Sequence, residues 1–169
     1  MKKIVLTYGL ISGGIAAALL LATLPFISSL QANQALIVGY TGIVLSALLI
    51  FFGVRSYREN VGNGKISFGR AFTVGILIAL ISAGCYVAAW ELVYYKISPE
   101  FAEKCFDKQV EDLKAAGAPQ EKIDEASREV ESFKKLYANP FVNVAFTFIE
   151  PFPVGVLMTL ISAVILRRK

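Results

Sequence analysis

Four long stretches of apolar residues divide the chain, and polar segments separate them. The stretches cover residues 4–27, 35–54, 68–95 and 141–166. Within the first three, the charged side chains are Arg70 near the start and Glu91 near the end of the third. A helix needs about 20 predominantly apolar residues to cross about 30 Å of hydrocarbon. The pattern therefore predicts an all-α integral membrane protein with a bundle of four transmembrane helices.

Composition agrees with a chain that is surrounded partly by lipid. Of the 169 residues, 56% are hydrophobic, and the mean hydropathy is +0.60, which is too high for an ordinary soluble domain. The length suits one membrane domain over residues 1–169. The net charge of +4 comes from basic residues beside the apolar stretches, which favours the lipid bilayer as partner and argues against nucleic acid.

The first apolar stretch follows Met1, Lys2 and Lys3, the order found in a secretory signal peptide. The stretch is longer than a typical signal core, and no small-residue cleavage motif is evident before Gln31. We therefore expect an uncleaved first transmembrane helix.

Basic residues predict the orientation of the four spans, because cytoplasmic loops retain lysine and arginine. They gather before the first span, between the second and third, and after the fourth, at Lys2, Lys3, Arg55, Arg58, Lys65, Arg70, Arg167, Arg168 and Lys169. The opposite side has the uncharged turn 28–34 and the segment 96–140, in which acids outnumber bases. Both termini are therefore expected in the cytoplasm, and the bacterial cytoplasmic (inner) membrane is the expected location.

The polar segment over residues 98–138 predicts two amphipathic helices. Ser98-Pro99-Glu100 has the form of a helix start, Gly117 can end that helix, and Pro119 can open the next. Apolar residues recur at three- and four-residue steps in both arms. We therefore expect an extracytoplasmic helical hairpin whose arms pack on each other. Two alternatives stay open: the hairpin lies flat in the membrane interface, or it presents its apolar stripe to a partner protein.

Glu91 and Glu150 are the candidates for a ligand or proton site, since an unpaired charge within a span costs about 2.5–3.5 kcal/mol. At about 1.5 Å per residue, Glu91 lies about 30 Å from Arg70 and Glu150 about 25 Å from Arg167, near the outer boundary. One hypothesis is an outward-facing cavity where these acids bind a cation, a proton or a cationic ligand. The alternative is that each acid reaches interfacial water or a tyrosine hydroxyl and only fixes the depth of its helix.

Two prolines beside Glu150 reinforce this candidate site. Pro151 and Pro153 remove backbone hydrogen bonds from the fourth span and predict a kink there. The carbonyl groups that such a kink frees would add to the polarity around Glu150.

Small residues recur at four-residue spacing in all four spans, a pattern that lets helices approach closely in lipid. They are Gly9, Gly13, Ala17, Gly42, Ser46, Ala71, Gly75, Ala79, Ala83, Gly155, Thr159 and Ala163. Packing within one bundle is the first interpretation. Association into a homo-oligomer, or with another membrane protein, is the second.

The chain shows no arrangement of residues that is typical of an enzyme or a metal site. It contains no histidine, its two cysteines have no C-x-x-C spacing, and no nucleophile has a matching base. We therefore expect no enzymatic activity, no cofactor and no metal site, and a role as a binding, assembly or structural component of the membrane. The alternative function is a small transporter or channel subunit that uses Glu150 and Glu91, which would need an oligomer to form a pathway.

Several short motifs resemble an uncharacterised bacterial membrane-protein family, the domain of unknown function forty-one ninety-nine. They are Y-G-L-I-S-G-G from Tyr8, G-K-I-S-F-G-R-A-F from Gly64, I-S-P-E-F from Ile97, and N-P-F from Asn139 with F-I-E-P-F-P-V-G from Phe148. The resemblance covers nearly the whole chain. It implies a four-helix membrane fold and assigns no activity.

Overall fold

The computed structural model describes residues 1–27 and 30–168 as an all-α structure. Ser28 and Ser29 of the predicted outer turn, and Lys169 of the predicted basic cluster, lie outside the described residues. The helices are α1 (Lys2–Ile27), α2 (Ala32–Asn60), α3 (Phe68–Leu92), the π-helix η1 (Val93–Ile97), α4 (Glu100–Ala115), α5 (Gln120–Tyr137), α6 (Pro140–Ile149) and α7 (Pro151–Leu166).

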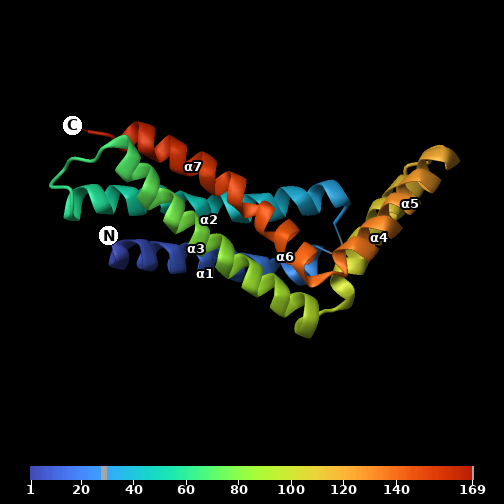
Figure 1. Cartoon of the computed structure of the whole chain (residues 1–169). Helices are drawn as coiled ribbons and strands as arrows, with labels where there is room; N and C mark the ends of the chain where they lie inside the picture. Colours follow the sequence, from blue (N-terminus) through green and yellow to red (C-terminus); the bar gives the residue numbers. More distant parts are fainter. Residues whose placement is uncertain (28–29, 169) are drawn as a thin grey trace.

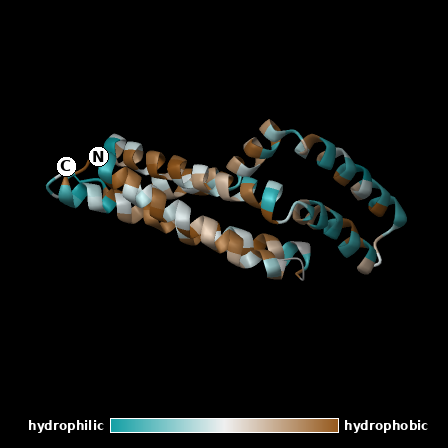
Figure 2. Ribbon diagram, turned by 90° about the horizontal axis from the view of Figure 1, so that it is seen from below, coloured by the Kyte–Doolittle hydropathy of each residue, from teal (hydrophilic) through white to brown (hydrophobic). Residues whose placement is uncertain are grey.

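Four long segments pack side by side: α1, α2, α3 with η1, and α6 with α7 (Figure 1). By length and composition each is suited to crossing a membrane, over Lys2–Phe26, Asn33–Asn60, Phe68–Ile97 and Pro140–Leu166. Hydrophobic residues dominate these segments in Figure 2, and large apolar side chains such as Leu157 (59% exposed) lie on the outer surface. Apolar helices with apolar outer surfaces indicate a membrane protein.

Small residues allow these segments to touch closely. A Cβ atom added to Gly75 of α3 would lie 2.7 Å from Thr159 Cγ2 of α7, and one added to Gly155 of α7 would lie 2.9 Å from Ala79 Cβ of α3. Gly13 of α1 meets α3 in the same way. The glycines of the predicted stripes therefore pack against neighbouring helices of the same chain.

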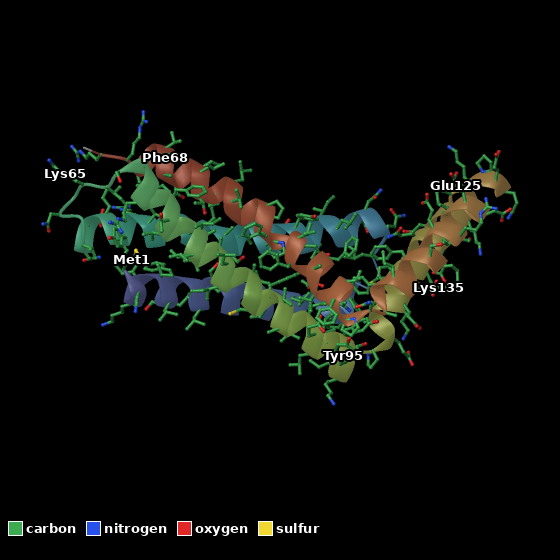
Figure 3. All side chains as sticks on the ribbon, viewed as in Figure 1. Met1, Lys65, Phe68, Tyr95, Glu125 and Lys135 are labelled. Atoms are coloured by element: carbon green, nitrogen blue, oxygen red, sulfur yellow. The ribbon has the colours of Figure 1, made fainter. Side chains whose placement is uncertain are left out.

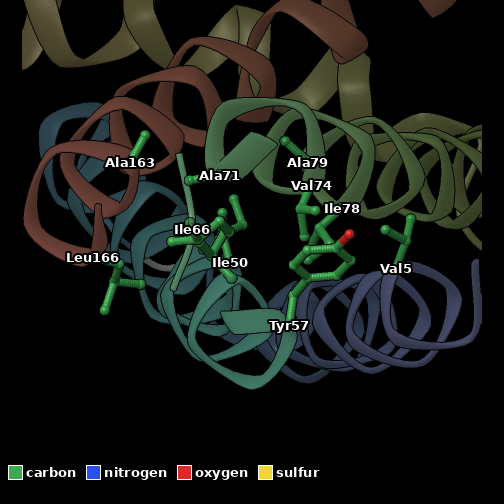
Figure 4. Packing of buried hydrophobic residues seen from close by; sticks show 12 residues of the cluster. Val5, Ile50, Tyr57, Ile66, Ala71, Val74, Ile78, Ala79, Ala163 and Leu166 are labelled. Atoms are coloured by element: carbon green, nitrogen blue, oxygen red, sulfur yellow. The ribbon is translucent and has the colours of Figure 1, made fainter. Parts of the chain in front are cut away.

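The apolar core lies where α1, α2, α3 and α7 meet, towards the end that holds the N-terminus (Figure 4). Ile50 of α2 and Val74 and Ile78 of α3 are almost completely buried there. Further along the segments the contacts become polar: the Ser12 hydroxyl of α1 donates to the Ser46 carbonyl oxygen of α2 over 2.8 Å. Hydroxyl groups that bond across helices in this way add to packing where lipid provides no hydrophobic driving force.

A tight turn joins α2 to α3 and contacts the end of α7. Asn63 and Gly64 have φ values of 49° and 83°, and a Cβ on Gly62 would lie 2.0 Å from the Lys65 carbonyl oxygen, so this turn requires glycine. Ile66 then exchanges two backbone hydrogen bonds with Arg168, at 3.0 and 2.9 Å. The loop and the end of α7 are therefore joined at the end where the N-terminus also lies (Figure 1).

Helices α4 and α5 form a polar helix pair at the other end (Figures 1 and 2). The rings of Phe106 and Phe133 meet edge to face with centroids 5.2 Å apart, and Lys134 Nζ lies 2.6 Å from Asp107 Oδ1. Gly117, with φ +67°, turns the chain between the two helices. Figure 3 shows Glu125 on the helix pair and Lys65 at the opposite end of the molecule.

Helix α4 starts at the predicted motif, directly after a π-helix that the sequence did not predict. The Ser98 backbone N–H donates to the Val93 carbonyl at 2.9 Å, the five-residue step of a π-helix, so Ser98 closes η1. Helix α4 then begins at Glu100, directly after Pro99. Ser98 therefore joins the two helices, and its carbonyl oxygen accepts a hydrogen bond from the Phe101 backbone N–H over 3.0 Å.

Candidate functional site

Glu150 lies where the fourth long segment is interrupted. Helix α6 ends at Ile149 and α7 begins at Pro151, with Glu150 between them. Pro151 has no N–H to donate, and its ring crowds the carbonyl one turn earlier. Pro153 follows on the exposed side of α7. Both prolines that the sequence analysis singled out therefore lie directly after Glu150. The interruption of the helix places the Glu150 carboxylate within an apolar segment.

The Glu150 carboxylate has a hydrogen-bond partner on α3. The Tyr86 hydroxyl donates to Glu150 Oε2 over 3.1 Å. Tyr86 is only 7% exposed, whereas Glu150 is exposed within the isolated chain. No lysine or arginine among the described residues forms a salt bridge with Glu150. One tyrosine therefore holds this carboxylate, and its charge is not balanced by a neighbouring cation.

A cavity of about 1230 Å³ opens beside Glu150. Its walls come from the ends of α1 and α2 nearest the helix pair and from α4, and Tyr86, Trp90 and Glu150 line the part formed by α3 and the α6–α7 junction. The α1 and α2 side is mainly apolar, with residues such as Leu20 and Ile37. The α4 side carries charged residues. The cavity is therefore apolar along one wall and polar along the other.

Charged side chains around the cavity are more often acidic than basic. The acids are Asp107, Glu111, Asp112 and Glu150, and the bases are Lys104 and Lys108. Lys104 pairs with Glu100 over 3.0 Å, and Lys108 with Asp112 over 3.7 Å. Because both lysines have carboxylate partners on α4, they leave the charge of Glu150 uncompensated.

A second polar cluster ties the helix pair to α6. The hydroxyls of Tyr137 and Thr147 lie 3.2 Å apart, and the Thr147 hydroxyl also donates to Asn143 Oδ1 over 3.3 Å. All three side chains are buried. Asn143 Nδ2 has no hydrogen-bond partner among the residues that the structure describes. The end of α5 is therefore fixed to α6 through hydroxyl and amide groups.

Tyr137 lies within electrostatic range of both predicted acids. Burial raises the pKa of its phenol to about 12, and the charges of Glu150 and Glu91 add to that shift. The Thr147 hydroxyl and the Trp90 indole act in the opposite direction and favour the ionised phenol. Tyr137 therefore faces the same region as both acids.

Glu91 nevertheless belongs to a different environment from Glu150. It is partly buried on α3, its Oε1 has no hydrogen-bond partner in the described part of the chain, and it does not line the cavity. Tyr86, the partner of Glu150, lies five residues earlier on α3, which corresponds to about 7.5 Å along the helix. The structure thus brings Glu150 to the cavity and leaves Glu91 nearer the end of the segment.

The polar partners Tyr86, Asn143 and Thr147 were not singled out as functional candidates from the sequence. Asn143 and Thr147 are spaced four residues apart within an apolar stretch, a local signal for one polar helix face. Tyr86 gives no such signal, because its partner Glu150 is 64 positions away. A tertiary contact of that kind becomes visible only in the fold.

The cysteines and acids offer no cluster for a metal ion. Within residues 1–27 and 30–168, no group of three histidine, cysteine or acidic side chains is placed to hold one. Cys85 and Cys105 are free thiols. Cys105 lies in the cavity wall, where burial raises the pKa of its thiol.

Comparison with protein families gives a match that covers nearly the whole chain. The family is described as a protein of unknown function (DUF4199), and its match extends over residues 7–168. No curated protein and no solved structure matches the chain. The matched region includes all four long segments and the helix pair, in agreement with the resemblance that the sequence motifs indicated. The chain therefore belongs to the DUF4199 family.

Proposed function

We propose that this protein is a non-enzymatic binding component of the bacterial cytoplasmic membrane. In this proposal the four long segments span the bilayer as a bundle, both termini lie in the cytoplasm, and α4 and α5 form an extracytoplasmic hairpin. The positions of the basic residues support that orientation. Arg55, Lys65 and Arg168 lie towards the end of the bundle that holds the N- and C-termini, away from the helix pair.

The cavity beside Glu150 is the observation that carries the proposal. Its volume of about 1230 Å³ exceeds the range of about 300–1,000 Å³ that is usual for small-molecule sites. One wall is apolar and the other is charged, which suits a molecule with a long apolar part and a polar group. We therefore propose that the cavity binds an amphiphile that comes from the outer leaflet.

Tight packing between the cavity and the middle of the long segments favours binding over transport. Near the middle of the segments, Ser46, Ser82, Pro151 and Gly155 surround a space of only about 10 Å³, close to the minimum for one water molecule. A transporter that used both acids would also place them along one route, whereas Glu150 lines the cavity and Glu91 does not. The transporter or channel alternative is therefore the weaker one.

Two glycine substitutions provide a matched test of amphiphile binding. A Cβ atom on either Gly39 or Gly84 would meet no other atom within 4 Å, so both positions accept a side chain. Gly39 lines the cavity and Gly84 does not. We expect Gly39→Leu to obstruct the cavity, while Gly84→Leu leaves it open.

The measurement is native mass spectrometry of the purified full chain in an uncharged detergent. The probes have one tetradecyl chain and three different head groups: trimethylammonium, hydroxyl and sulfate. We expect one copy of at least one probe to bind saturably to the natural chain and to Gly84→Leu, and binding to Gly39→Leu to be several-fold weaker. If no probe binds, or if Gly39→Leu binds like Gly84→Leu, the cavity is not an amphiphile site and the proposed function is wrong.

A further inference from the structure

We propose that the cavity recognises the ammonium group of a cationic amphiphile, with Glu150 and the surrounding aromatic rings as the recognition site. This inference rests on the proposed function and specifies the chemical class of its ligand. It depends on three features of the described residues: the uncompensated carboxylate, the aromatic lining and the excess of acids over bases.

Glu150 provides the first feature. Tyr86 donates to Oε2, and among the salt bridges of the described residues none involves Glu150. A carboxylate at spanning depth is costly when it lacks a cation, and acids in that position mark ion or ligand sites by default. An ammonium group at the open side of the carboxylate would supply the missing charge.

Aromatic side chains provide the second feature. Tyr40, Tyr86, Trp90 and Phe101 line the cavity together with Glu150. Trp90 of α3 and Phe101 of α4 meet edge to face, with ring centroids 6.2 Å apart and planes inclined by 69°. Aromatic faces attract cations through their quadrupoles, tryptophan most strongly, and quaternary ammonium groups are the ligands that aromatic cages commonly bind. Such rings beside one carboxylate therefore favour an ammonium group over an alkali cation.

Charge along the rest of the lining is the third feature. The acids Asp107, Glu111 and Asp112 on α4 outnumber the two lysines of the same wall. Salt bridges join Asp107 to Lys134, Asp112 to Lys108 and Lys104 to Glu100. An anionic head group would face this acidic wall without a free cation to pair with. The apolar wall formed by α1 and α2 accommodates a hydrocarbon chain, so an amphiphile fits better than a small soluble cation.

The three tetradecyl probes also test the head-group preference. In the natural chain we expect the trimethylammonium probe to bind about tenfold more tightly than the alcohol, and the sulfate to bind most weakly. In Glu150→Gln, which keeps an acceptor for Tyr86, the trimethylammonium probe should lose about tenfold in affinity, while the alcohol should change by less than about twofold.

Two further variants separate recognition from general disturbance. Glu103→Gln removes the same charge from an exposed position on α4 outside the cavity and should leave all three affinities unchanged. Tyr86→Phe removes the hydrogen bond to Glu150 and should weaken the trimethylammonium probe by about threefold. Ratios between probes are compared within each variant, so differences in ionisation efficiency cancel.

The outcomes distinguish this inference from the proposed function. If all three probes bind the natural chain equally, or if Glu150→Gln weakens the alcohol as much as the ammonium, the cavity binds amphiphiles without recognising a cation and the inference is wrong. If Glu150→Gln does not fold, the order of the three affinities in the natural chain decides alone. Binding by none of the probes would overturn the proposed function itself.

Discussion

Gly75 of α3 and Thr159 of α7 face each other so closely that a Cβ atom on the glycine would lie 2.7 Å from Thr159 Cγ2 and 3.0 Å from its hydroxyl oxygen. Thr159 is fully buried, and its hydroxyl has no hydrogen-bond partner among the described residues. A Cα–H group of glycine is a weak donor to an oxygen at this kind of helix contact. The glycine therefore lets α7 approach α3 closely at the level of the Thr159 hydroxyl.

This contact predicts a strong effect of side-chain size at position 75. Gly75→Leu should lower the free energy of unfolding by at least about 1–3 kcal/mol, because inserted atoms force closely packed neighbours apart. Gly84→Leu is the control, since a Cβ there meets open space. Thermal unfolding of both variants in the same detergent measures the difference. Equal midpoints would mean that α3 and α7 are not held together at Gly75.

Cysteine labelling tests the orientation in the membrane. In a chain with Cys85 and Cys105 replaced by serine, a cysteine at Glu125 on the helix pair should react with an impermeant maleimide added outside intact cells. A cysteine at Lys65, at the opposite end of the molecule, should react only after the membrane is opened. Labelling in the reverse pattern would place the termini outside and refute the proposed topology.

The hydroxyl of Tyr137 should stabilise the contact between α5 and α6. Tyr137→Phe removes the 3.2 Å contact with Thr147, and the expected cost is about 0.5–1.5 kcal/mol. Tyr95→Phe is the control, because Tyr95 is 47% exposed. Hydrogen exchange of the backbone amides at the end of α5 should be faster in Tyr137→Phe than in the control. Unchanged exchange would show that the hydroxyl does not hold the helix pair in place.

Alkaline pH should weaken the same contact. Burial raises the pKa of the Tyr137 phenol from its ordinary value of 10.0 to about 12, so folding favours the protonated form. The contribution of the protonated Tyr137 phenol to the free energy of unfolding is complete below about pH 10 and is lost as the pH rises towards 12. Titration of tyrosinate absorbance, as the difference between the natural chain and Tyr137→Phe, should show one phenol that ionises near pH 12. A difference curve centred near pH 10 would contradict this burial.

Cys105 reports on the cavity through its thiol. Burial raises the pKa of Cys105 above its ordinary value, and the thiolate is the reactive form. Alkylation should therefore be slow at neutral pH and should accelerate only at a more alkaline pH than the alkylation of an exposed cysteine. The bound trimethylammonium probe should slow it further in the natural chain but not in Gly39→Leu. Peptide mass spectrometry separates Cys105 from Cys85.

The four long segments could be predicted from the sequence because crossing a membrane requires only length and apolar composition. Helix α1 ends at Ile27 as the apolar stretch does, but α2 continues to Asn60, beyond the predicted 54. Arg55 and Glu59 form an i,i+4 ion pair over 3.0 Å in this extension, and such a pair supports a helical turn that hydropathy does not detect.

The candidate site was only partly predictable. Glu150 stands out because an acid in an apolar stretch is costly, and Pro151 locates the interruption of the helix. The environment of Glu150 depends on Tyr86, which is distant in sequence, and on where α4 lies relative to α2. The π-helix η1 helps to set the position of α4 because its turn contains one more residue than a turn of α-helix. No residue pattern in Val93–Ile97 predicts a π-helix.

Helix α4 contributes to the proposed ligand site without taking part in the closest contacts between the long segments. Helix α4 forms the charged wall of the cavity, whereas the close contacts at Gly75 and Gly155 lie among the long segments. Substitutions on the cavity side of α4 can therefore change the charge and shape offered to a ligand without disturbing those contacts. In the proposed binding role, the ligand preference can therefore change through this one helix while the packing of the long segments stays the same.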